Sequence, residues 1–174
     1  DQDLAPASED RRADPHMGRA RGDGGGVVAA HAHRKLAEAV PVYQRYLAME
    51  RSPVALNNLG AALRDLGRSA EAVECFRESL TLDSDYADGR LNLGLALADV
   101  GEFTQSEAAL TQALAVLPGP SANASTTGPR YLQAVNGYGS VLRRQGRVEE
   151  MLALYRRVAG AAPNERLIVT GPGL

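Results

Sequence analysis

Asparagine and aspartate side chains recur at a fixed spacing in the middle of the sequence, and their chemistry suits the recognition of another polypeptide. The step from Asn58 to Asn92 equals the step from Asp65 to Asp99. A primary amide donates and accepts hydrogen bonds at once, so it matches a peptide group whatever side chain that peptide carries. The spacing therefore indicates a binding surface built from repeated units. The alternative interpretation is that these four residues only solvate exposed helix faces.

The sequence shows no combination of side chains that is typical of catalysis. The three histidines, His16, His31 and His33, lie before the full repeats. His31 and His33 would diverge on a helix because they are two residues apart. Acidic residues alternate with arginines in the manner of solvated surface pairs, and nowhere do a nucleophile, a base and an orienting group converge. We therefore expect a non-enzymatic chain with no catalytic residue, no metal and no cofactor.

Composition and charge narrow the classes of function. The 174 residues carry a formal net charge of −2, which argues against a nucleic-acid partner. Apolar residues make up 44% of the chain, with two Phe, six Tyr and no Trp, which favours many small contacts between helices. Neither a signal peptide nor a run of 18 apolar residues is visible, so we expect no membrane partner and a cytoplasmic location. The chain does not begin with Met, which leaves open a fragment of a longer protein.

A repeat of about 34 residues, a period typical of stacked supersecondary units, organises the elements that carry the asparagines. The stretch from Leu56 to Gly67 returns from Arg90 to Gly101, and a third copy runs from Val135 to Gly146. Each copy carries apolar residues on one helical face and ends on a glycine that can adopt the left-handed conformation. A second helix follows, so each unit is expected to be an antiparallel helix hairpin.

A second glycine lies inside the first helix of each copy, at Gly60, Gly94 and Gly139. Such a glycine costs about 1 kcal/mol relative to alanine. Its recurrence suggests that the missing side chain lets the partner helix approach.

The repeats divide the chain into segments. We expect a flexible N-terminal tail over 1–28, a half or degenerate repeat over 29–52, full repeats over 53–86, 87–120 and 131–165, an inserted loop over 121–130, and a C-terminal tail or the start of a further domain over 166–174. Pro41 is expected close to the start of a packed helix, because a proline in mid-helix removes a hydrogen bond and clashes with the preceding turn.

The copies resemble the tetratricopeptide repeat family over about residues 34 to 165. The resemblance rests on three sets of residues: Leu59, Gly60, Leu63, Gly67, Ala72 and Phe76; Leu93, Gly94, Leu97, Gly101, Ala113 and Pro118; Tyr138, Gly139, Leu142, Gly146, Tyr155 and Pro163. It implies an all-α fold, an α-solenoid with a right-handed superhelix of about 3.5 helix-turn-helix units. Ser106 stands where the family has a small alanine, which predicts loose local packing.

The family binds peptides along a concave surface lined by the first helix of each pair, so the resemblance implies a protein-interaction scaffold. At 100° per residue, Asn58, Ala61 and Asp65 lie opposite the apolar face of their helix. Carrying these positions forward by the repeat gives Asn92, Leu95 and Asp99, then Gly137, Ser140 and Arg144. With neighbouring polar residues included, the candidate peptide-binding residues are Asn57, Asn58, Ala61, Asp65, Asp88, Asn92, Leu95, Asp99, Ser140 and Arg144. The pair Asn58 and Asn92 resembles the asparagine ladder in the repeat arms of O-linked N-acetylglucosamine transferases.

The charges on this surface predict the character of the ligand. Asp65, Asp88 and Asp99 favour a protein or peptide with basic character over an acidic peptide terminus. Two alternatives to a simple scaffold stay open. In the first, the chain is the substrate-recruiting arm of a larger enzyme, such as a glycosyltransferase like the O-linked N-acetylglucosamine transferases. In the second, it self-associates through the apolar ends of a short solenoid.

Overall fold

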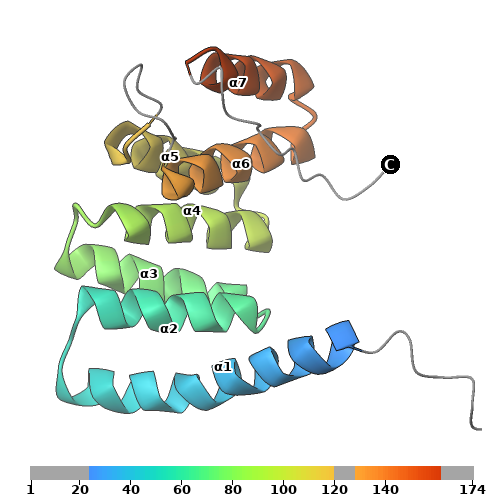
Figure 1. Cartoon of the computed structure of the whole chain (residues 1–174). Coiled ribbons are helices and arrows are strands. Elements are labelled where there is room, and N and C mark those ends of the chain that lie inside the picture. The colour runs from blue at the N-terminus through green and yellow to red at the C-terminus, as the bar shows by residue number, and fades with distance from the viewer. Residues whose placement is uncertain (1–23, 120–127, 162–174) are drawn as a thin grey trace, which may run out of the picture.

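The structure of the chain, a computed structural model, describes residues 24–119 and 128–161. Helices make up nearly all of these two ranges, and no strand occurs within them, so the expected all-α solenoid is confirmed (Figure 1). The helices are α1 (Gly24–Met49), α2 (Pro53–Asp65), α3 (Ser69–Leu82), α4 (Ala87–Val100), α5 (Phe103–Val116), α6 (Pro129–Arg144) and α7 (Val148–Ala161). The predicted C-terminal segment, most of the predicted inserted loop and residues 1–23 of the predicted tail lie outside the described residues.

Three hairpins, α2 with α3, α4 with α5 and α6 with α7, follow one another along the stack (Figure 1). Each hairpin turns at a glycine with positive φ: 78° at Gly67, 88° at Gly101 and 76° at Gly146. The amide after each glycine donates to the carbonyl five residues earlier, at 2.8 to 2.9 Å. This bond satisfies a carbonyl that the helix end leaves free. The predicted role of these glycines in ending the first helices is confirmed.

The glycines inside the first helices each face a large side chain of the second helix. A Cβ built on Gly60 would lie 2.6 Å from Cε1 of Phe76, and one on Gly94 would lie 2.6 Å from Cγ of Leu110. At Gly139 it would collide with the hydroxyl of Tyr155. The three contacts show why a side chain is missing at these positions: the second helix fills the space that a Cβ would need.

Serine hydroxyls on the second helices form hydrogen bonds to the first helices of the same pairs. Ser106 is fully buried and donates a hydrogen bond to the carbonyl of Gly94 at 2.6 Å. Ser79, also fully buried, donates to the carbonyl of Pro53 at 2.8 Å. The expectation of loose packing at Ser106 is wrong, because the hydroxyl finds a backbone acceptor and the position stays free of solvent.

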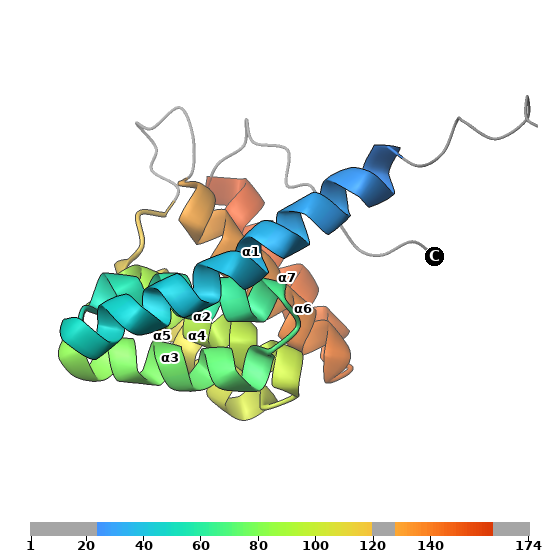
Figure 2. The same cartoon turned by 90° about the horizontal axis from the view of Figure 1, so that it is seen from below.

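Helix α1 differs from the other second helices in its length. It runs for 26 residues with Pro41 inside it, so the expectation that the packed helix starts close before Pro41 is wrong. Residues 24–28, expected in the flexible tail, form its first turns. The repeat places His33 at the position that the turn glycine Gly67 holds in the next unit. A histidine adopts positive φ far less readily than glycine, so the helix continues where a turn would stand. Its N-terminal part extends beyond the other helices (Figure 2).

A charged cluster joins the second and third hairpins. Glu107 on α5 accepts hydrogen bonds from Nη1 of Arg147 at 2.7 Å and from the hydroxyl of Tyr138 at 2.8 Å. Arg147 also pairs with Glu150 at 2.7 Å. The hydrogen bond from Arg147, followed by that from Tyr138, holds the pKa of Glu107 below its usual value, although burial opposes the shift.

The cluster gives a pH-dependent prediction. Because the folded-state pKa of Glu107 is lowered, its stabilisation is present above the ordinary carboxyl range and is lost as the pH falls through the folded-state pKa. Glu107→Gln is expected to lower the free energy of unfolding at pH 7 by about 1 kcal/mol. Urea denaturation between pH 3 and 7 should give a shallower acid limb for the variant than for the wild type.

The matched control is Glu74→Gln on α3. The side chain of Glu74 is 72% exposed and pairs with Arg77 within one helix turn, so the change should cost less than about 0.5 kcal/mol. Equal losses at Glu74 and Glu107 would contradict the assignment of a stabilising cluster between the hairpins.

Candidate protein-binding surface

The first helices α2, α4 and α6 lie next to one another, with α4 in contact with both of the others. They carry all of the candidate peptide-binding residues. Four of these are exposed, namely Asn58, Asp65, Asp99 and Arg144; three are half-buried, namely Ala61, Asp88 and Ser140; three are buried, namely Asn57, Asn92 and Leu95.

Two of the buried candidates pair with each other. Nδ2 of Asn92 on α4 donates to Oδ1 of Asn57 on α2 at 2.8 Å. The two residues are only 8% and 5% exposed. The amide of Asn92 therefore ties α4 to α2, whereas Asn58, its equivalent in the preceding unit, is exposed to solvent.

The amide pair yields a stability prediction. Asn92→Ala is expected to cost about 1–3 kcal/mol, because it leaves the buried amide of Asn57 without its partner. The double change Asn57→Leu with Asn92→Ala should cost less than Asn92→Ala alone, because no buried amide is then left unpaired. Leu91 and Gly137 hold the corresponding places between α4 and α6, and Leu91 is fully buried there. Urea denaturation of these two variants and of Asn57→Leu alone measures the coupling, and strictly additive losses would contradict the pairing.

Charged side chains make further ties between neighbouring first helices. Nε of Arg64 on α2 lies 2.6 Å from Oδ2 of Asp99 on α4, and Arg130 on α6 pairs with Asp88 on α4 at 3.3 Å. Nη1 of Arg144 donates to the carbonyl of Ala98 at 2.6 Å, and its guanidinium lies 5.7 Å from the centre of the Phe103 ring. Asp88 and Asp99 are thus already neutralised within the chain.

Asp65 is the acidic candidate that stays without such a tie. It is exposed and makes no hydrogen bond or ion pair in the part of the chain that the structure describes. Its equivalent on α4, Asp99, is held by Arg64 of the preceding first helix. No first helix precedes α2 among the described residues, so Asn58 and Asp65 both face solvent. We call the accessible set Asn58, Ala61, Asp65, Asp99 and Ser140 the first-helix strip.

A hollow of about 340 Å³ adjoins the strip between α1 and α2. Its lining residues are Val42, Tyr43, Tyr46, Ser52, Val54, Ala55 and Asn58. Three of them are large and exposed: Val42 at 54%, Val54 at 52% and Tyr46 at 44%. This hollow was not predicted from the sequence, because Val42 and Tyr46 lie off the helical face that Leu36, Tyr43 and Leu47 share.

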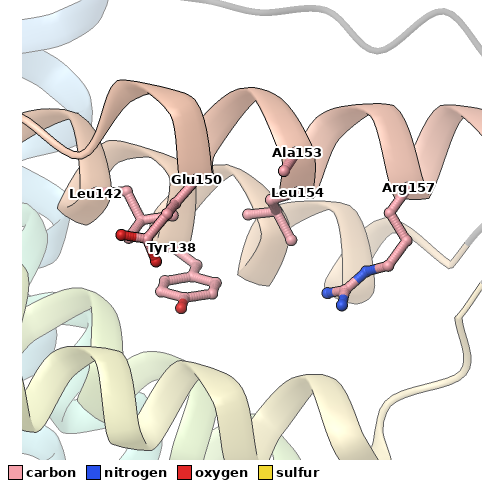
Figure 3. A pocket seen from close by; sticks show the side chains of 6 residues that line it. All are labelled: Tyr138, Leu142, Glu150, Ala153, Leu154 and Arg157. Atoms are coloured by element: carbon pink, nitrogen blue, oxygen red, sulfur yellow. The ribbon is translucent and has the colours of Figure 1, made fainter.

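A second hollow, of about 300 Å³, lies between α6 and α7 (Figure 3). It is lined by Tyr138, Leu142, Glu150, Ala153, Leu154 and Arg157. Its polar groups are in part engaged already, since Tyr138 bonds Glu107 and Glu150 pairs with Arg147. None of its lining residues belongs to the first-helix strip.

Other kinds of site find little support in the described residues. Within residues 24–119 and 128–161, no three His, Cys, Asp or Glu side chains gather as metal ligands. No helix in those ranges combines the length and apolarity needed to cross a bilayer. Cys75 is half-buried against the first core cluster, and burial raises the pKa of its thiol, as expected for a packed cysteine.

Comparison with known proteins matches this architecture. Sequence models of the tetratricopeptide repeat match residues 53–86 and residues 91–166. A probable UDP-N-acetylglucosamine–peptide N-acetylglucosaminyltransferase SPINDLY from Hordeum vulgare is 33% identical over 89 residues, covering 51% of this chain and 9% of that protein. The protein O-mannosyl-transferase Tmtc3 from Drosophila melanogaster is 27% identical over 112 residues, covering 62% and 12%. The chain thus spans only 9% to 12% of the length of these curated relatives.

Solved structures share the fold at low sequence identity. A crystal structure of MamA has a TM-score of 0.62 and 22% identity, covering 76% of this chain and 72% of that one. The Sgt2 TPR domain from Aspergillus fumigatus has a TM-score of 0.55 and 20% identity, covering 72% and 78%. At these identities the likeness concerns the stacked hairpins alone.

Proposed function

Because the chain belongs to the tetratricopeptide repeat family, we propose that it is a non-catalytic interaction module that holds a partner protein, or an extended peptide of one, against its first helices. Repeats of this family typically serve as protein-interaction scaffolds and not as catalysts. One observation supports the location of the site: α2, α4 and α6 lie adjacent and leave the first-helix strip accessible to a ligand that crosses them.

The strip supplies two kinds of contact in this proposal. The amide of Asn58 is exposed and can pair with a peptide group of the ligand. The carboxylate of Asp65 offers an unpaired negative charge, whereas Asp99 is paired with Arg64. The basic character that we propose for the ligand therefore depends mainly on Asp65.

Selection of binders from a random displayed peptide library by the full chain tests this function. We expect the selected peptides to be enriched in Lys and Arg. Their affinity should fall about tenfold on Asp65→Arg, which corresponds to about 1.4 kcal/mol.

The control for the selection is Glu74→Arg on α3. Glu74 lies on a second helix with its side chain 72% exposed, so its reversal changes the net charge equally without touching the strip. Selected peptides that were acidic, or that lost the same affinity with both variants, would contradict the proposal.

A second candidate function is favoured by the match to SPINDLY, which is 33% identical over 89 residues. In this case the repeats would be the substrate-recruiting arm of a larger glycosyltransferase. The coding sequence beyond codon 174 tests the proposal. A catalytic domain in the same frame supports it, and an immediate stop codon excludes it.

A further inference from the structure

The C-terminal half of α1 is a second helix that lacks its first helix among the described residues. The repeat places Val42 where Phe76 stands in the next unit, and Tyr46 where Leu80 stands. Phe76 is fully buried under Gly60 of α2, whereas Val42 is 54% exposed. The hollow of about 340 Å³ beside Val42 and Tyr46 therefore lies where a first helix would pack against α1.

Helix α2 offers two polar side chains to such a helix: Asn58, which lines the hollow, and Asp65, two turns further along α2. On α4, Asn92 bonds Asn57 and Asp99 bonds Arg64, both from the preceding first helix α2. Their equivalents on α2, Asn58 and Asp65, are exposed. By the same geometry, Asn58 would bond an amide and Asp65 a cation on an incoming helix, and those two partners would lie seven residues apart. Seven residues on a helix span about 10.5 Å along one face.

The part of this chain where the repeat would place such a helix does not supply one. The repeat would build it from residues 19–31, but residues 24–31 are part of α1. The positions equivalent to Asn57 and Arg64 are Asp23 and Ala30, so this segment has no cation at the position that would face Asp65.

A second copy of the chain is also a poor occupant. Its α6 carries Asn136 and Arg143, which are exposed and seven residues apart. However, the face of α6 that would have to meet Val42 is the face around Gly139, and Tyr155 of α7 already covers it. A copy could enter only by detaching its own α7.

We propose that the hollow between α1 and α2 receives an amphipathic helix of a partner protein, parallel to α2. This helix carries Asn or Gln opposite Asn58, Arg or Lys seven residues later opposite Asp65, and apolar residues against Val42, Tyr46 and Val54. The inference rests on the proposed function and specifies the form of the partner at the N-terminal end of the first-helix strip.

The size of Val42 sets a further requirement on the incoming helix. Phe76 fills the space above its own first helix, so α2 needs glycine at residue 60. Valine is smaller than phenylalanine, so an incoming helix can carry a larger apolar side chain at the corresponding position. A leucine there should fill the hollow better than glycine does.

Capped peptides with the sequence of residues 52–68 test the inference on the full chain. This segment contains Asn57 and Arg64, a serine N-cap and the terminal glycine of α2. Calorimetry or fluorescence anisotropy should show that the version with Gly60→Leu binds at least tenfold tighter than the native version. Arg64→Glu in the peptide should weaken binding at least tenfold, and Asp65→Arg in the protein should restore the affinity of that reversed peptide.

Val42→Glu in the protein should abolish binding while leaving the circular dichroism spectrum unchanged, because the side chain is exposed.

Absence of binding by both peptides, or binding without rescue by the reversed charge pair, would overturn the inference. So would light scattering that showed a dimer of the full chain that Asp65→Arg dissolves, since the occupant would then be a second copy. If the helical peptides fail while the displayed library still yields ligands that depend on Asp65, the proposed function stands and only this inference falls.

Discussion

Replacing Phe76 with alanine is expected to lower the free energy of unfolding by about 3–5 kcal/mol, a large share of the 5–15 kcal/mol or so that a domain typically has. The Phe76 side chain is fully buried. Its ring occupies the space that a Cβ on Gly60 would need, 2.6 Å from Cε1, and it packs in the core cluster shared by α1 to α5. Alanine would leave a cavity at the centre of the first hairpin. Urea denaturation followed by circular dichroism measures the loss.

Gly60→Ala provides the paired control for Phe76→Ala. Alone it should cost about 1–3 kcal/mol, because the new methyl group forces the Phe76 ring to move. In the Phe76→Ala background the methyl group enters the cavity, so its cost should shrink or reverse sign. Additive losses in the double variant would show that the two residues do not pack as the structure has them.

Leu110→Ala is expected to cost about 2–5 kcal/mol and to loosen the third hairpin first. Leu110 is fully buried and has two neighbours that lack side chains. A Cβ on Gly94 would lie 2.6 Å from its Cγ, and one on Gly137 of α6 would lie 3.5 Å from its Cδ2. Since each unit of a repeat array contacts only its neighbours, loss of this side chain weakens the attachment of α6 and α7. Hydrogen exchange should show reduced protection there before α2 and α3 are affected.

Val116→Ala is the control for Leu110→Ala. Val116 ends the same helix and is 53% exposed, so its truncation should change the free energy of unfolding by no more than about 0.5 kcal/mol. A uniform loss of protection across α2 to α7 in the Leu110 variant would contradict the expected order of opening.

The hairpins were predictable from sequence because their determinants are local. A turn that needs positive φ selects glycine at Gly67, Gly101 and Gly146, and a close helix contact selects glycine at Gly60 and Gly94. The length of α1 was not predicted, because it depends on the absence of a turn glycine between the two helices of this unit. His33 stands at the turn position, and its effect becomes evident only when the helix is seen to continue.

The proposed binding surface was predictable only in part. The helical period places Asn58 and Asp65 away from the apolar face, and both are exposed. The ties from Asn57 to Asn92 and from Arg64 to Asp99 join positions that are not equivalent in the two repeats. Both ties depend on how α4 packs against α2. A comparison of equivalent positions in successive repeats does not show which side chains of the two helices face each other.

Backbone amide chemical shifts of the full chain, recorded while a selected ligand is added, test the central claim most directly. We predict that the largest changes fall on the first helices α2, α4 and α6 and on the C-terminal half of α1, centred on Asn58 and Asp65. Changes concentrated on the second helices α3, α5 and α7 would place the ligand away from the first-helix strip and contradict the proposed function.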